Sequence, residues 1–261
     1  MLIQLISDVH LEFRDGNYPF IPRRAPIIAL LGDIGRPFSR VYYRLLKDLS
    51  KRFRSVLVIA GNHEFYSSRH RKLTITEIRA KLEEVTSHFD NVHYLENQSM
   101  VLDGVRFLGC TLWTNIPEDM WKDARKKMND YRMCYIDRYE EINIGVPLSP
   151  THTTFWHEES VRWLIREIDL SREPVVILSH HCPYTHETSS AEYLANPLNC
   201  CYSTNLVRLF RKPVVAWLYG HTHHPYNKYV NGVHVVSNPL GYPGELENEK
   251  EVLTNPPIVE V

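Results

Sequence analysis

Polar side chains of the kinds that bind metal ions follow five apolar stretches of the chain, each at the point where the stretch ends. In chain order these residues are Asp8 and His10, Asp33, Asn62 and His63, His180, and His221 and His223. Taken alone, each has an ordinary structural explanation, such as an Asx turn for Asp33 or a hydrogen-bonded core position for a histidine. Five such endings in one chain are better explained by a shared site, because open α/β sheets bind ligands at the carboxyl ends of their strands.

Carboxylate, imidazole and amide groups together form a mixed oxygen and nitrogen donor set. Such a set suits Mn²⁺, Fe, Zn²⁺, Co²⁺ or Ni²⁺, with manganese as the first candidate. Because the set contains no cysteine, it argues against a sulfur-rich structural zinc site. The ligand-type residues are too many for one tetrahedral ion but fit two ions that share a carboxylate. Two metals roughly 3.5–4 Å apart can clamp the attacking and leaving oxygens of a displacement at phosphorus, with a bridging hydroxide as nucleophile.

The stretches that carry these residues read as buried strands. Residues 56–60, Val-Leu-Val-Ile-Ala, show no polar alternation, which predicts a central strand covered on both faces. Similar apolar runs lie at 2–6, 27–31, 174–178 and 214–219. Helical spacing over 41–53 links two of these strands, so we expect a mostly parallel sheet in an α/β protein.

Further elements follow from local patterns. Thr74-Ile-Thr-Glu77 is a capping box that predicts a helix start, and apolar spacing predicts helices over 155–170 and about 203–210. Strands are expected at 92–95, 100–102, 105–108, 110–113, 228–230 and 233–236, with hairpin turns at Asp103-Gly104 and Asn231-Gly232. The stretches 114–153 and 182–202 break the pattern, and we interpret them as excursions from a single domain that spans residues 1–261.

Composition excludes several classes of protein. A chain of 261 residues with 43% hydrophobic residues can bury one substantial core. A formal charge of −1 gives no general attraction to nucleic acid or to acidic membranes. The sequence shows no run long and apolar enough to cross a membrane and no signal peptide. Five cysteines without a CxxC spacing favour reduced thiols, so we expect a cytoplasmic protein.

Five segments resemble, in the same order, the motifs of the calcineurin-like metallophosphoesterases. They are Asp8-Val9-His10, Gly32-Asp33, Gly61-Asn62-His63-Glu64, Ser179-His180 and Gly220-His221-Thr222-His223. The resemblance covers roughly residues 2–240. It implies a four-layer α/β fold, in which two mixed β-sheets pack as a sandwich flanked by helices, with two metal ions at the strand ends.

The resemblance also implies a role for each of these residues. One metal would take Asp8, His10 and His223, the other would take Asn62, His180 and His221, and Asp33 would bridge them. The family histidine that matches His63 is not a ligand, because it faces the phosphate as a general acid or transition-state stabiliser.

Four more residues are candidates for supporting roles. Glu64 is expected behind the ligands, as an acceptor for a ring nitrogen of a ligating histidine. His181 follows a ligand in a strand, so it should point the opposite way and lie behind the site. Arg36 and Arg132 are predicted substrate contacts through a phosphate oxygen, with exposed loop positions as the alternative.

The sequence departs from the signatures of two subfamilies, which argues against their substrate classes. Phosphoprotein phosphatases carry GDxVDRG and GNHE followed by Ser-Arg, whereas residues 32–36 here read Gly-Asp-Ile-Gly-Arg and Phe65-Tyr66 follows Glu64. Purple acid phosphatases need a tyrosine ligand where Arg36 stands. Residues 109–113 and 238–242 resemble a group of short, single-domain metallophosphoesterases.

We therefore predict a hydrolase of phosphodiesters or small phosphomonoesters, with a small phosphorylated substrate as its partner. A phosphoprotein phosphatase and a non-catalytic metal-binding scaffold are the alternatives. A scaffold should have lost ligands, whereas this sequence keeps the complete set.

Overall fold

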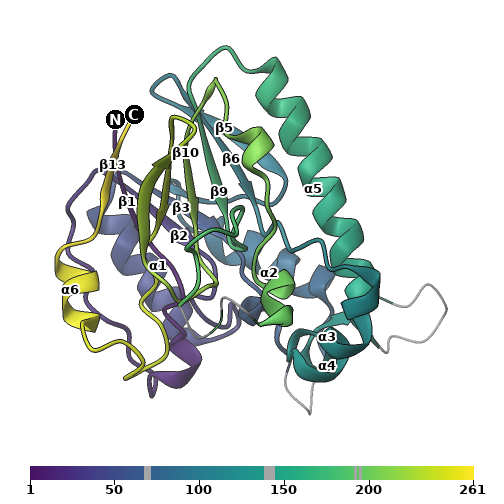
Figure 1. The fold of residues 1–261 in the computed structure, drawn as a ribbon. Coiled ribbons are helices and arrows are strands. Elements are labelled where there is room, and N and C mark those ends of the chain that lie inside the picture. Colours follow the sequence, from purple (N-terminus) through teal and green to yellow (C-terminus); the bar gives the residue numbers. More distant parts are fainter. Residues whose placement is uncertain (68–71, 138–144, 191–192, 194–195) are drawn as a thin grey trace.

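The computed structural model describes residues 1–261 apart from 68–71, 138–144, 191–192 and 194–195. Two β-sheets pack face to face, and helices cover the outer face of each sheet (Figure 1). The predicted sandwich of two mixed sheets flanked by helices is therefore confirmed. In the part of the chain that the structure describes, every helix is too short or too polar to span a membrane.

The first sheet carries the amino-terminal motifs. Its order is β13 (Ile258–Glu260), β1 (Leu2–Ile6), β2 (Ile27–Leu31), β3 (Ser55–Ile59) and β4 (Val92–Tyr94). Strands β1 to β4 are parallel, and β13 pairs with β1 antiparallel. The carboxyl ends of three neighbouring strands therefore meet at one edge, as the sequence predicts.

The second sheet carries the remaining motifs. Its order is β11 (Tyr226–Val230), β12 (Val233–Ser237), β10 (Val214–Tyr219), β9 (Val175–Ser179), β6 (Val105–Cys110) and β5 (Gln98–Leu102). The four inner strands are parallel, and the two edge strands join them through hairpins. These hairpins turn at the predicted Asp103-Gly104 and Asn231-Gly232, where all four residues have positive φ.

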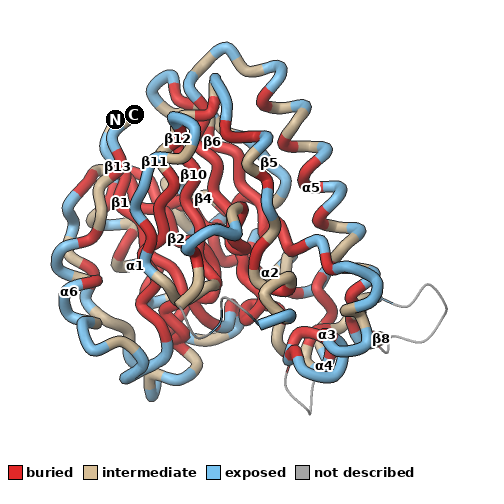
Figure 2. Tube along the Cα trace, viewed as in Figure 1, coloured by how far each residue is buried: buried red, intermediate tan, exposed pale blue. Residues whose placement is uncertain are grey.

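Alternate side chains of each strand enter different cores, which explains the unbroken apolar runs. In β3, Leu57 and Ile59 face the core between the sheets, whereas Val56 and Val58 face the helices on the outer side. In β9, Val176 faces the core between the sheets. Figure 2 shows buried strands at the centre of the molecule and exposed residues on the helices around them.

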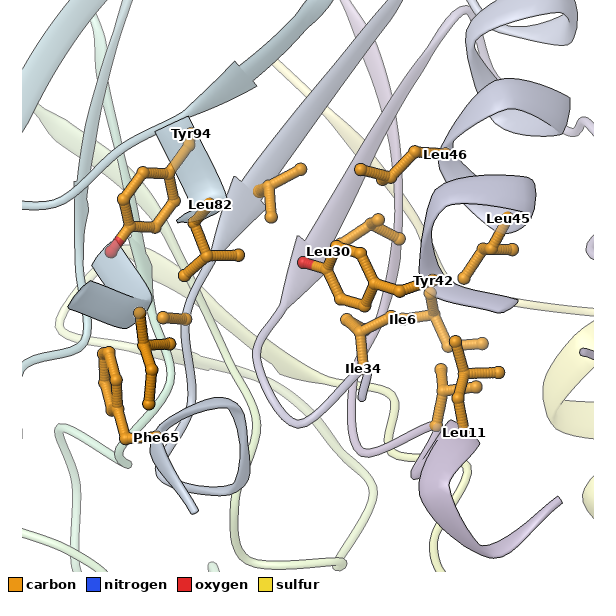
Figure 3. Packing of buried hydrophobic residues seen from close by; sticks show 14 of the residues in the cluster. Ile6, Leu11, Leu30, Ile34, Tyr42, Leu45, Leu46, Phe65, Leu82 and Tyr94 are labelled. Carbon is orange, nitrogen blue, oxygen red and sulfur yellow. The ribbon is translucent and has the colours of Figure 1, made fainter. Parts of the chain in front are cut away.

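Two helices cover the first sheet and one covers the second. α1 (Arg40–Arg52) begins at an N-cap, Ser39, and α2 (Ile75–Thr86) begins at the predicted capping box of Thr74 and Glu77. Figure 3 shows Tyr42, Leu45 and Leu46 of α1 against Leu30 of β2, with Leu82 of α2 beside Tyr94. The long helix α5 (Pro150–Leu170) packs on the second sheet through residues such as Leu164.

The remaining elements are short. They are α3 (Trp121–Lys127), α4 (Asp130–Met133), α6 (Glu249–Thr254), the two-stranded sheet of β7 (Tyr135–Ile136) and β8 (Val146–Pro147), and 3₁₀ turns at Leu11–Phe13, His63–Phe65, Glu118–Met120, Pro197–Cys201 and Val207–Leu209. The predicted excursion over 114–153 thus contains α3, α4 and the first turn of α5.

Three local predictions need correction. The helix expected over 203–210 is only a 3₁₀ turn, Val207–Leu209, because Ser203 forms a parallel β-bridge with Cys182. The N–H groups of Thr204 and Leu206 continue this pairing with the carbonyls of Cys182 and Pro183. The strand expected over 110–113 ends at Cys110, because Leu112 and Trp113 adopt positive φ. The helix expected from residue 155 begins at Pro150, where proline is favoured in the first turn.

Candidate metal centre

The five sequence motifs converge on one edge of the two sheets. Asp8 and His10 follow β1, Asp33 follows β2, Asn62 and His63 follow β3, His180 follows β9, and His221 and His223 follow β10. Several contacts join the sheets at this edge. Among them, His180 Nδ1 lies 2.8 Å from the Leu31 carbonyl, and the His221 N–H donates to Asp8. The packing is close, since a Cβ at Gly61 would lie 2.2 Å from Asp33 Oδ1. Glycine is therefore required there.

The backbone is strained where these side chains are presented. Asp8, His10, Asp33, His221 and His223 all have positive φ, between 49° and 72°. Residues with side chains adopt this region rarely and at a cost, and such residues cluster at functional sites. Left-handed site residues thus follow β1, β2 and β10, whereas Asn62 after β3 has a helical φ of −73°.

Three predicted ligands form a first group. His10 Nε2 lies 3.1 Å from His223 Nε2, and His223 Nε2 lies 3.4 Å from Asp8 Oδ1. One ligand-type atom from each of these three residues lies within 4.8 Å of the other two. These are the residues that the resemblance assigns to one metal.

The other three terminal ligands form a second group. His180 Nε2 lies 3.1 Å from Asn62 Oδ1 and 3.1 Å from His221 Nδ1. Asp33 stands between the groups, with Oδ1 3.5 Å from His180 Nε2 and Oδ2 4.0 Å from His10 Nε2. One carboxylate therefore reaches toward both groups, as a bridging ligand must.

The chemistry of the two groups fits divalent cations. Donor atoms bound to one ion at about 2.1 Å lie about 3.0–3.4 Å apart at the usual bond angles, close to the separations seen here. The Asp8 and Asp33 carboxylates are buried, and burial raises the pKa of each. The neighbouring histidines lower the pKa by more than burial raises it, so both pKa values lie below normal. Among the described residues, the basic side chains within 4 Å of these carboxylates are all histidines. Cations would neutralise the carboxylates and leave the imidazoles neutral, as ligation requires.

Acceptors hold the second ring nitrogen of three predicted ligands. Glu12 Oε1 lies 3.2 Å from His10 Nδ1, Glu245 Oε2 lies 2.7 Å from His223 Nδ1, and the Leu31 carbonyl holds His180. Such partners fix the orientation of a ligating imidazole. The sequence interpretation missed both glutamates. Glu12 is two residues from His10, which was an available signal, whereas Glu245 is brought to His223 only by the fold.

Glu64 has a different role from the expected one. Its carboxylate accepts backbone N–H groups of Gly61, Asp33, Ile34 and Gly35 at 2.6–3.0 Å, and it bonds to no ring nitrogen of the described residues. It joins the loops after β2 and β3, because four N–H groups there point at one buried carboxylate. Glu64 therefore holds Asp33 in place through the backbone.

His181 lies behind the site, against His221, with their ring centroids 4.2 Å apart. Its Nδ1 lies 3.1 Å from the Thr111 carbonyl. Burial, and then the neighbouring His180, lowers the pKa of His181 to about 3, so the ring stays neutral. His181 therefore packs against the predicted ligand His221 as a neutral ring.

The first excursion reaches the site through Asp130. This buried carboxylate accepts hydrogen bonds from Asn62 Nδ2 and from the Tyr66 hydroxyl, both at 2.7 Å. Because the amide nitrogen of Asn62 is held on this side, its Oδ1 faces His180. Asp130 therefore supports Asn62 through a direct hydrogen bond, a role that no local sequence pattern indicates.

A cavity of about 330 Å³ opens over the centre. Its described lining includes Asp33, His63, His221 and His223 at the base, and Tyr66, Lys127, Asn129, Asn196, Tyr202 and Tyr242 on the walls.

The two arginines predicted to contact substrate, Arg36 and Arg132, are not among the described residues that line this cavity. Arg36 is exposed and borders a separate hollow beside Phe38, and exposed Arg132 bonds to Asn129.

His63 is held by three polar contacts. Its backbone N–H donates to Asp33 Oδ1, its Nδ1 lies 2.8 Å from Glu12 Oε1, and its Nε2 lies 3.3 Å from the Tyr242 hydroxyl. Burial lowers the pKa of His63, but the carboxylates of Asp33 and Glu12 raise it more, so the net pKa is above normal. The ring therefore tends to carry a proton that it could give to a substrate oxygen.

Comparisons with known proteins indicate the same family as the five sequence motifs. A family model described as calcineurin-like phosphoesterase matches residues 1–225. Uncharacterized protein L509 of Acanthamoeba polyphaga mimivirus is 29% identical over 265 residues, which cover 95% of this chain and 93% of that protein. The crystal structure of phosphopantetheinyl hydrolase from Mycobacterium tuberculosis superposes with a TM-score of 0.67 at 18% identity and covers 95% of this chain and 94% of that one. At this identity the likeness shows a shared fold.

Proposed function

Because this chain belongs to the calcineurin-like phosphoesterase family, and is thus a hydrolase of phosphoester bonds, we propose that it cleaves phosphodiesters or small phosphomonoesters at a two-metal centre. The observation that carries the proposal is the convergence of six donor side chains as two groups that share the Asp33 carboxylate. Asp8, His10 and His223 would hold one ion, and Asn62, His180 and His221 would hold the other. When bound, two divalent ions polarise the phosphoryl oxygens and lower the pKa of the attacking water.

The protein's own residues would supply positioning and a proton. Asp33 fixes the distance between the two ligand groups, and Glu64 fixes Asp33 through the backbone. Glu12 holds His63 Nδ1, so Nε2 is the nitrogen left to face the substrate. His63 would give its Nε2 proton to the leaving oxygen or stabilise charge there, which general acids do with a gain of roughly 10²–10⁴-fold.

The cavity supports a small substrate. Its volume, about 330 Å³, is near the lower end of the range for small-molecule sites. Among the described lining residues beyond the ligand groups and His63, Lys127 and Glu245 are charged, and the others are uncharged, mainly tyrosines and asparagines. One charge of each sign among uncharged polar groups suits a compact polar substrate better than a charged peptide surface.

All five cysteines are free, which supports a reducing compartment such as the cytoplasm.

The proposal is tested by a substrate screen of the metal-reconstituted protein. The substrates are an aryl phosphomonoester, an aryl phosphodiester, a cyclic nucleotide, a phosphopeptide and a phosphopantetheinyl ester, the last because one similar structure is a phosphopantetheinyl hydrolase. We expect hydrolysis of small esters with a higher kcat/KM than for the phosphopeptide, and loss of activity after chelation. A preference for the phosphopeptide, or equal rates in the chelated control, would contradict the proposal.

A further inference from the structure

Tyr242 is a part of the site that the metal-binding motifs do not explain. It lies in the loop after β12, beyond the residues 1–225 that the family model matches. Its side chain lines the cavity, is 38% exposed, and brings the hydroxyl to 3.3 Å from His63 Nε2. The phenol therefore shares the cavity with the one nitrogen of His63 that faces the substrate.

Contacts on several sides fix Tyr242 in this position. Its ring stacks on His10 with centroids 4.3 Å apart and an interplanar angle of 24°, and Phe13 meets it edge-on at 5.6 Å. Its backbone N–H donates to Glu245 Oε2 at 2.7 Å, the same oxygen that lies against His223 Nδ1. The preceding Gly241 has a φ of +76°, so the chain can turn tightly there. The ring that carries the hydroxyl is thus held by the predicted ligand His10 and by Glu245, which also contacts the predicted ligand His223.

The hydrogen-bond roles around His63 follow from Glu12. Because the Glu12 carboxylate accepts from Nδ1, only Nε2 can act on the substrate. An oxygen placed within hydrogen-bond distance of Nε2 lies next to the Tyr242 hydroxyl. A phenol hydroxyl carries its proton at neutral pH and can donate it in a hydrogen bond.

We propose that Tyr242 is a catalytic residue whose hydroxyl donates a hydrogen bond to the same leaving-group oxygen that His63 serves; this rests on the proposed function. As the oxygen of water forms a new bond to phosphorus, the bond from phosphorus to the leaving oxygen breaks. Its electron pair stays with the leaving oxygen, which takes the proton from Nε2 and departs as an alcohol. The departing alcohol then releases the hydroxyl, which donates to the now neutral Nε2. The structure holds the two groups 3.3 Å apart, close enough for this hydrogen bond.

Tyr242→Phe tests the proposal, because phenylalanine keeps the ring on His10 and removes only the hydroxyl. We expect kcat to fall by about 10²-fold, the lower end of the range for loss of one transition-state donor, with the metal content unchanged. The fall should be greater for alkyl esters than for 4-nitrophenyl esters, because alkyl leaving oxygens develop more charge that needs stabilising. The matched control is Tyr229→Phe, a tyrosine 71% exposed that stacks on His234 in the β11–β12 hairpin.

A double variant distinguishes shared action from separate effects. If both residues serve one oxygen, Tyr242→Phe should cost much less in a His63→Ala background than in the wild type. Fully additive losses, an unchanged kcat, a fall that does not depend on the leaving group, or loss of metal from Tyr242→Phe would each overturn the proposal. A metal-loaded wild type that hydrolyses no ester would instead overturn the proposed function itself, and this inference with it.

Discussion

Asp33→Asn is expected to lower the occupancy of both metal ions together and to reduce kcat/KM by more than about 10²-fold. The change removes the charge of the one carboxylate that reaches both ligand groups. Even residues that only support ligands typically cost 10–100-fold in metal affinity or activity when mutated, so a shared ligand should cost more. Elemental analysis of the dialysed protein gives the occupancy, and a small aryl phosphoester gives the activity.

The asparagine variant should still fold, which makes the result interpretable. An amide retains an Oδ1 that can accept the His63 backbone N–H, a bond of 2.8 Å in the structure. The matched control is His10→Ala, which removes a ligand of one group only and should weaken chiefly one ion. Full retention of both ions by Asp33→Asn, or identical patterns of loss in the two variants, would contradict the bridging assignment.

His63→Ala should lower turnover by roughly 10²–10⁴-fold while the protein keeps its metal ions. The physical reason is that His63 stands beside the ligand groups with Nε2 toward the cavity, and Glu12 and Asp33 favour its protonated form. Steady-state kinetics combined with elemental analysis separates this loss from a loss of metal. His234→Ala, in the exposed hairpin, is the control for removing an imidazole elsewhere. Wild-type turnover in the His63 variant would remove this residue from the mechanism.

The sequence was sufficient to predict the centre of the site for a geometric reason. Parallel strands bring their carboxyl ends to one edge, so ligand-type residues that directly follow β1, β2, β3, β9 and β10 had to meet. The unbroken apolar runs predicted strands buried on both faces, and the alternation of Val56 and Leu57 between two cores shows why. The order of the motifs then indicated the family.

The surroundings of the site were less predictable because they depend on contacts between distant segments. Glu245 reaches His223, Asp130 reaches Asn62 and Tyr242 reaches His63 across loops whose paths no local pattern specifies. Glu64 was predicted to support a ring nitrogen, but the fold turns four backbone N–H groups toward it. The missing helix near Ser203 has the same kind of cause, since its N–H groups pair with the segment at Cys182.

The number of metal ions bound per folded chain tests the central claim most directly. Purified protein, reconstituted with a divalent transition metal and freed of excess, should hold about two ions by elemental analysis, and phosphoester hydrolysis should rise in parallel with the bound metal. A well-folded protein that cannot be loaded with metal, or one that hydrolyses phosphoesters equally well without it, would contradict the two-metal centre.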